Sequence, residues 1–367
     1  MLGTVFTVVV LLRFFVPLLI PKFPLPAILA CLVIDAADQS IFQMFTDKPM
    51  PGYQTYDKAL DTYYLAIAYF SAMRNWREPV AFQVTRFLYL YRLIGVTLFE
   101  LFGQRWIIFI FANTFEYFFI AYEGIRTRWN PFRLSARQVV GLAAFIWIFI
   151  KLPQEWWIHI AQLDFTEFMA DHSYMWGVLA VLVIGAAIVG YTQRSKIPPK
   201  DWSFTVDVDA HLEPVDTSMT GHEKFFSAVL VEKAVLLGLL SVIFAQVLPD
   251  IRATNLGLVI GVSVLVVSNS LVSQWLRRRG RSWSTTGAAF LAMLAINVSL
   301  VMVDALLLHR GDDGDFPALN TLFFTVLLSL LIAMYDRFRA TRNEGEELRM
   351  VMAALHRERA EKDAVPA

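Results

Sequence analysis

The sequence has little charge and almost no cysteine. Of its 367 residues, 17% are charged and 57% are hydrophobic, whereas a soluble domain carries about 25% charged residues. Basic and acidic residues number 32 each, so no net charge draws the chain toward nucleic acid. The single cysteine, Cys31, has no partner within the chain, which excludes an intrachain disulfide and a cysteine-based metal site. These deficits predict an integral membrane protein.

Long apolar runs divide most of the chain, and about eleven of them reach the length of roughly 20 residues that a membrane-spanning helix needs. Short polar breaks separate the runs, and several of these breaks contain proline. We therefore predict an all-α fold, a polytopic transmembrane helical bundle over residues 1–340. The predicted spans are 2–20, 25–46, 60–78, 80–102, 105–125, 136–153, 173–192, 225–248, 256–276, 284–308 and 317–336.

Basic residues concentrate in alternate loops between these spans. Cytoplasmic loops of membrane proteins are enriched in lysine and arginine, and this bias sets the orientation of the chain. The pattern predicts that the N-terminus lies outside a cell membrane and the C-terminus in the cytoplasm. The basic residues are Arg74, Arg77, Arg126, Arg128, Arg133, Arg137, Arg194, Lys196, Lys200, Arg277, Arg278, Arg279, Arg281, Arg337, Arg339 and Arg342.

Two polar segments lie outside the predicted spans. The first is a cytoplasmic insert at about 194–224, where apolar and polar residues alternate from Phe204 to Leu212 and predict a short strand. The second is the tail 341–367, a charged segment with an apolar stripe that predicts a cytoplasmic helix. A cytoplasmic partner protein is a candidate occupant of that stripe.

Four aspartates lie between the second and third spans. Asp35 and Asp38 are three residues apart and Asp57 and Asp61 are four apart, so on helices each pair shares a face. Carboxylates at this spacing predict oxygen ligands for a divalent metal such as Mg²⁺ or Mn²⁺, or carriers of a proton or cation across the membrane. A third interpretation is purely structural, with Asp35 and Asp38 capping a helix end. All three interpretations stay open at this point.

The same spacing, D-x2-D, eighteen residues and D-x3-D, resembles the acidic skeleton of the CDP-alcohol phosphotransferases over about residues 9–70. That family uses its acids to hold divalent metals, so the resemblance implies a membrane enzyme acting on a lipid-linked phosphate. The glycine and Ala-Arg positions of the family motif are occupied here by Gln39, Phe42, Gln43 and Tyr53.

The fourth and fifth spans carry further ionisable residues. Arg86 and Glu100 are fourteen apart, close to four helical turns, so they share a face. Arg92 and Glu116 lie on neighbouring spans and are predicted to form a buried pair. Ionisable residues at membrane depth are either paired for structure or mark a substrate path. We predict that Arg86, Arg92, Glu100 and Glu116 lie near a substrate or ion path.

Three functions fit these observations. The first is a cation- or proton-coupled transporter that uses the aspartate cluster. The second is a divalent-metal-dependent membrane enzyme with a lipid-linked substrate, and the third is a membrane scaffold without chemistry. Membrane lipids are predicted partners in every case, whereas a small ion or a lipid-linked molecule would be the ligand in the first two.

Overall fold

The computed structural model describes most of the N-terminal two thirds of the chain and parts of the rest. The described residues are 2–45, 53–163, 165–210, 228–247, 263, 266–267, 291–292, 294–299, 322–339 and 342. All regular elements in these ranges are helical, which confirms the predicted all-α class for this part of the chain. The predicted spans 256–276 and 284–308, the insert beyond 210 and the tail beyond 342 lie wholly or largely outside the described residues.

The helices follow the apolar runs closely, and several begin with proline or a capping side chain. Pro24 and Pro79 each occupy the first position of a helix, where the missing backbone N–H has no partner to lose. The Ser135 and Gln138 side chains form a reciprocal capping box. The first six α-helices and their short connecting turn are α1 (Leu2–Phe15), η1 (Val16–Leu19), α2 (Pro24–Phe45), α3 (Tyr53–Asn75), α4 (Pro79–Phe102), α5 (Arg105–Ile110) and α6 (Thr114–Arg126).

The next helix continues from Ala136 to Ile160, beyond the predicted span 136–153, and contains two π-helical segments. It ends before Gln162, whose φ of 52° lies in the left-handed region. The remaining elements are η2 (Pro131–Arg133), α7 (Ala136–Phe145), η3 (Ile146–Lys151), α8 (Leu152–Glu155), η4 (Trp156–Ile160), α9 (Phe165–Asp171), α10 (Met175–Gln193), η5 (Arg194–Lys196), η6 (Val208–Ala210), α11 (Ala228–Val247) and an unlabelled helix at 322–339.

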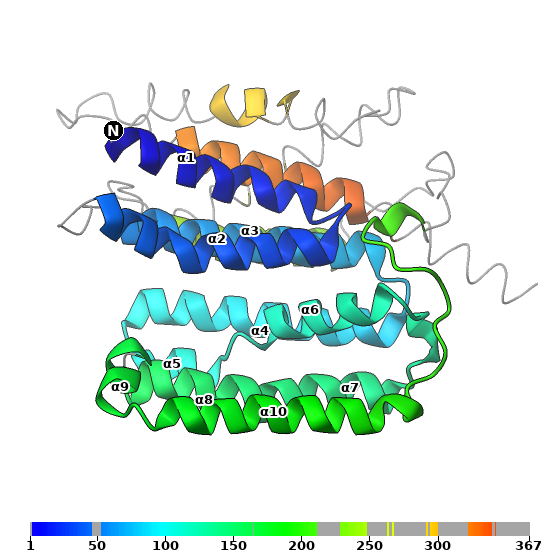
Figure 1. Cartoon of the computed structure of the whole chain (residues 1–367). Helices are drawn as coiled ribbons and strands as arrows, with labels where there is room; N and C mark the ends of the chain where they lie inside the picture. Colours follow the sequence, from blue (N-terminus) through cyan, green and yellow to red (C-terminus); the bar gives the residue numbers. More distant parts are fainter. Residues whose placement is uncertain are drawn as a thin grey trace, which may run out of the picture.

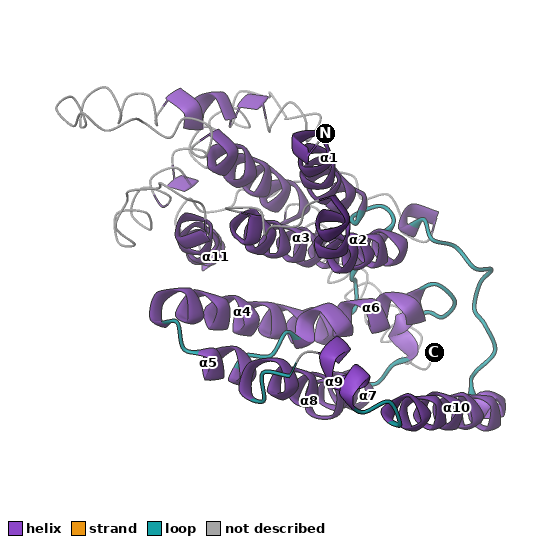
Figure 2. Ribbon diagram, turned by 60° about the vertical axis from the view of Figure 1, so that its left-hand side comes forward, coloured by secondary structure: helices purple, strands orange, loops and turns teal. Residues whose placement is uncertain are grey.

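The long helices lie nearly parallel and stack in layers (Figure 1). Figure 2 shows the same arrangement after rotation, with α1 outermost, then a layer of α2, α3 and α11, then α4 and α6, and α5, α7 and α8 beyond them. Helix α3 is the centre of its layer, because nearly every residue from Ala59 to Met73 is buried. It packs against α1, α2, α4, α6 and α11.

Among the described residues, two helices are long and apolar enough to cross a membrane by length and composition. They are Ala136–Ile160, with 25 residues, and Met175–Lys196, with 22 residues. Helix α10 lies at the edge of the bundle in both views, and large apolar side chains such as Val181 and Leu182 are exposed along it. Exposed apolar surface of this kind is typical of contacts with a membrane or with another protein.

Two local predictions are wrong. The predicted span 105–125 is not one helix, because α5 ends at Ile110 and α6 begins at Thr114. The segment after Phe204 contains no strand in its described part, and Val208–Ala210 forms a 3₁₀ turn. The segment lies against the start of α2 there, since the Val208 backbone N–H donates to the Lys22 carbonyl at 3.1 Å and the Val208 side chain is buried, whereas Phe204 and Val206 are exposed.

Candidate functional site

One arginine of α1 joins two of the four predicted aspartates. Nη2 of Arg13 donates to Oδ1 of Asp35 at 2.6 Å and also to Oδ1 of Asp61. The Arg13 side chain is only 4% exposed, while those of Asp35 and Asp61 are 31% and 38% exposed. Because the three residues come from α1, α2 and α3, this contact ties three helices together. The side chains of Asp38 and Asp57 lie outside the described residues.

The buried carboxylate of Glu116, on α6, lies close to Tyr64, which is one helical turn from Asp61 along α3. Tyr64 follows Asp61 by three residues, so both side chains lie on one face of α3. The Tyr64 hydroxyl donates to Oε1 of Glu116 at 2.8 Å, and Nδ2 of Asn113 donates to Oε2 at 2.9 Å. Glu116 is therefore a buried carboxylate of α6 with both oxygens hydrogen-bonded, as the low dielectric of such a site demands.

The helix break at Phe111–Asn113 exposes backbone groups inside the bundle. Nη1 of Arg92 donates to the Phe111 carbonyl at 3.1 Å. The Asn113 backbone N–H donates to Oε1 of Glu155 at 3.2 Å. Interrupted helices need such partners, because their unpaired N–H and C=O groups are costly away from water. Ionisable side chains thus replace the missing helical hydrogen bonds.

The long helix Ala136–Ile160 contributes a further group of ionisable side chains around its π-helical segments. Glu155 is four residues from both Lys151 and His159 and lies between them, with Nζ of Lys151 at 3.7 Å and Nε2 of His159 at 3.2 Å from its oxygens. Lys151 also lies over the Tyr117 ring at 4.2 Å. Single π-helical turns are rare and occur often at functional sites.

Together these residues form a series of polar contacts from α1 to the long helix, named here the transverse polar chain, in which Asp61 and Tyr64 are related by their shared face of α3. Three buried polar atoms beside it have no hydrogen-bond partner among the described residues: Nε of Arg92, Oδ1 of Asn113 and Oγ1 of Thr114. Buried polar atoms are nearly always satisfied, so this is the place where a water molecule or an ion would find ligands. The chain consists of Asp35, Arg13, Asp61, Tyr64, Glu116, Asn113, Glu155 and His159.

The predicted path residues fall at different places. Arg92 and Glu116 both belong to the helix-break region, but each bonds to other groups and the predicted direct pair is not formed between them. Arg86 instead pairs with Glu232 of α11 at 3.0 Å, on the other side of α4. Glu100 shares the helix α4 with Arg86 and lies near its end. Only Arg92 and Glu116 are thus brought near the aspartates.

Sequence reasoning missed Arg13, Tyr64 and Glu155. Arg13 had a visible signal, because it is the only charged residue in the apolar run 2–20 and such a residue needs a partner. Tyr64 and Glu155 had none, since tyrosines and acids near span ends are also typical of the membrane interface.

A metal site is not formed by the described side chains. No group of three or more histidine, cysteine, aspartate or glutamate side chains converges there in a way that would hold a metal ion. Arg13 lies between Asp35 and Asp61, where a shared metal would have to bind. The predicted Mg²⁺ or Mn²⁺ ligation by all four aspartates stays a prediction, because the side chains of Asp38 and Asp57 are not described.

No family model, curated protein or solved structure matches the chain.

Proposed function

We propose that the chain is a multi-pass membrane protein that couples the movement of a proton or small cation to its transverse polar chain. The proposed topology keeps about eleven spans, an outer N-terminus and a cytoplasmic C-terminus. The meeting of basic loops at one end of the bundle supports this orientation. Arg126, at the end of α6, donates to the Asn75 carbonyl at 3.2 Å, and Asn75 donates to the Pro21 carbonyl at 3.0 Å.

The observation that carries the proposal is the sharing of one buried arginine by two carboxylates. With both aspartates ionised, Asp35, Asp61 and Arg13 carry one more negative than positive charge. Uptake of one proton or one monovalent cation makes the group neutral. A neutral group is far cheaper to enclose in apolar surroundings than a charged one, so loading favours the closed conformation of such a site.

The chain beyond Asp61 supplies a route for protons between helix layers. Tyr64 has a hydroxyl that can both donate and accept; it donates to Glu116, and its side chain shares a face of α3 with Asp61. Glu116 is held at the break between α5 and α6, where a small movement of either half changes its surroundings. Broken helices with ionisable groups at membrane depth are the usual sites of ion coupling in secondary transporters.

The test is proton flux in sealed phosphatidylcholine vesicles, with the purified protein inserted and a pH-sensitive dye inside. We expect an imposed potential to drive proton entry through the unmodified protein. The variants Glu116→Gln and Tyr64→Phe should reduce this flux at least tenfold, because each removes a proton-exchanging group while keeping its size.

The matched controls come from a similar pair on the same helix. The Tyr69 hydroxyl donates to Oε1 of Glu232 at 3.4 Å, outside the polar chain. Tyr69→Phe and Glu232→Gln should therefore retain most of the flux. Equal loss in both pairs would indicate general damage, and unmodified flux in Glu116→Gln would refute the proposal. Absence of flux in every protein would favour the alternatives of a lipid-phosphate enzyme or a scaffold.

A further inference from the structure

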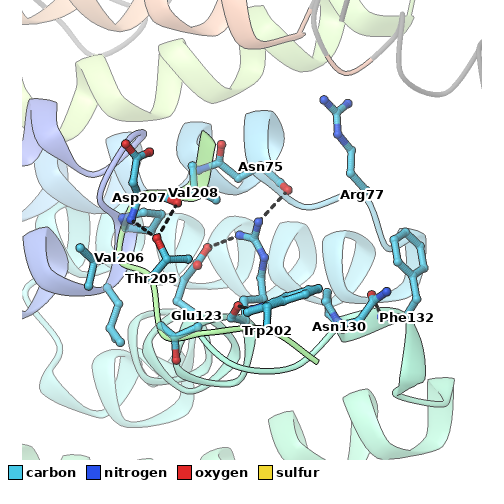
Figure 3. Close-up of a pocket in the computed structure, with 15 residues that line it drawn as sticks. Asn75, Arg77, Glu123, Asn130, Phe132, Trp202, Thr205, Val206, Asp207 and Val208 are labelled. Atoms are coloured by element: carbon cyan, nitrogen blue, oxygen red, sulfur yellow. Dashed lines mark hydrogen bonds and ion pairs between the residues drawn. The ribbon is translucent and has the colours of Figure 1, made fainter. Parts of the chain in front are cut away.

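A cavity opens at the basic end of the bundle, and none of the residues that line it belongs to the transverse polar chain (Figure 3). It has a volume of about 170 Å³ and lies between the ends of α2, α3 and α6 and the segment that follows η5. Dashed lines in Figure 3 join Arg126 to Glu123 and to the Asn75 carbonyl, with donor–acceptor distances of 2.7 Å and 3.2 Å. Trp202 and Thr205 line it from the side of the segment 198–210, here named the acidic strap.

The acidic strap is held on the bundle by three ion pairs. Asp201 lies 2.5 Å from Nη2 of Arg133, Asp207 lies 3.7 Å from Nζ of Lys22, and Asp209 lies 2.5 Å from Nη2 of Arg74. Three carboxylates of one segment thus cover three cations from three different helix ends. The strap neutralises a basic rim that the helices alone would present to the cytoplasmic side.

The two ends of the strap are anchored very differently. Asp201 is 15% exposed and also accepts the Asn130 backbone N–H at 2.7 Å, which fixes this end. Asp207 and Asp209 are 37% and 44% exposed. Exposed ion pairs contribute little net stability, so another anion is able to replace these two carboxylates at small cost.

The cations that they cover are already oriented. Nη1 of Arg74 donates to the Pro21 carbonyl at 2.6 Å and to Oδ1 of Asn75 at 3.0 Å, which aims Nη2 at the strap. Lys22 lies beside it just before α2, with Nζ over the Phe23 ring at 5.2 Å. Arg74 binds the carbonyl of Pro21, the residue before Lys22, so this guanidinium and this ammonium come from neighbouring chain segments at one end of the bundle. Both groups are ligands that bind phosphate.

We propose that Lys22 and Arg74 form a binding site for the phosphate of an anionic phospholipid head group, and that Asp207 and Asp209 are its internal competitors. Basic pockets between helix ends on the cytoplasmic side bind anionic head groups. Trp129 and Trp202 lie at the same end of the bundle, where they donate to the Pro198 and Arg126 carbonyls, and tryptophan is enriched at membrane interfaces. The inference depends on the membrane placement proposed above, but not on proton movement.

The experiment is a lipid titration of the purified full-length protein, followed by native mass spectrometry. Phosphatidylglycerol is the anionic probe and phosphatidylcholine the zwitterionic one. We expect phosphatidylglycerol to bind more tightly, and Asp207→Asn with Asp209→Asn to raise its affinity about tenfold by freeing two cations. The substitution Lys22→Gln should lower the affinity severalfold. The Asp207 carboxylate accepts the Asp209 backbone N–H at 3.0 Å, and the amide oxygen of the variant side chain can still accept it, so the turn is preserved.

The control is Asp171→Asn, an exposed acid of α9 at the opposite end, which should leave lipid binding unchanged. Equal binding of both lipids, or no gain in the double variant, would overturn the inference. Inorganic phosphate that competes as well as phosphatidylglycerol would assign the site to a soluble anion and overturn the lipid assignment. Normal proton flux with no lipid preference would remove this inference while leaving the proposed function intact.

Discussion

Gly95 of α4 lies directly against Phe111, the first residue of the break between α5 and α6. A Cβ atom added at Gly95 would clash with Cβ and Cγ of the Phe111 side chain. Real side chains do not approach so closely, so only glycine permits this contact. The Phe111 carbonyl in turn accepts from Arg92, and Glu116 lies in the first turn of the next helix. The position of the helix break thus depends on a missing side chain in a neighbouring helix.

The substitution Gly95→Ala should displace the break and destabilise the bundle. We expect a loss of about 1–3 kcal/mol, because overpacking forces backbone shifts of this cost. The control is Gly124→Ala in α6, where a Cβ meets nothing within 4 Å. There alanine should stabilise the helix slightly through its better propensity. Thermal melts in detergent report both effects, and equal melting temperatures for the two variants would contradict the prediction.

Removal of Arg13 should destabilise the fold by leaving two carboxylates without their shared cation. We expect Arg13→Gln to cost about 1–3 kcal/mol, below the range for fully buried pairs because both aspartates are about a third exposed. Adding Asp35→Asn and Asp61→Asn to the same protein should recover part of the loss, since no unpaired charge then remains. Chemical denaturation of the unmodified protein, Arg13→Gln and the triple variant measures these differences in the free energy of unfolding. A triple variant less stable than Arg13→Gln would show that the charges are not the cause.

Divalent metal should bind weakly, if at all, through Asp35 and Asp61 while Arg13 is present. Arginine and a metal ion compete for the same carboxylate oxygens. Calorimetry with Mg²⁺ and Mn²⁺ on the unmodified protein and on Asp57→Asn with Asp61→Asn measures this directly. Micromolar binding that disappears in the double variant would favour the enzyme suggested by the acid spacing.

The start of the C-terminal tail should contribute to the stability of the bundle. Arg342 is buried, its Nη1 donates to the Trp76 carbonyl at 2.9 Å, and its guanidinium lies 3.5 Å from the Phe82 ring centroid. A chain that ends at residue 341 should therefore melt several degrees lower than one that ends at 343, since a cation–π contact and a helix-capping bond are lost. Identical melting temperatures would assign the tail to partner binding alone.

The sequence by itself determined the helices and most of their bounds. Apolar runs of fixed length, proline at the first turn and basic loops are local signals, because backbone hydrogen bonds and chain stiffness act over a few residues. They located α2, α4 and α10 within a few residues. The unusual density of aspartates between Asp35 and Asp61 also marked two residues of the candidate site, Asp35 and Asp61. The sequence pattern did not predict the break at Phe111–Asn113, because the residues around it are as apolar as those of an intact span.

Only the tertiary structure decided which charges meet. Arg13 and Asp61 are 48 residues apart and Tyr64 and Glu116 are 52 apart, and Arg86 pairs with Glu232 of a helix distant in sequence. Helical periodicity tells which residues share a face, but not which face turns toward which neighbour. That choice is made by the packing of large aromatic side chains around α3 and by the glycine contact at Gly95. Which charged residues pair follows from this packing, so a local sequence pattern cannot predict it.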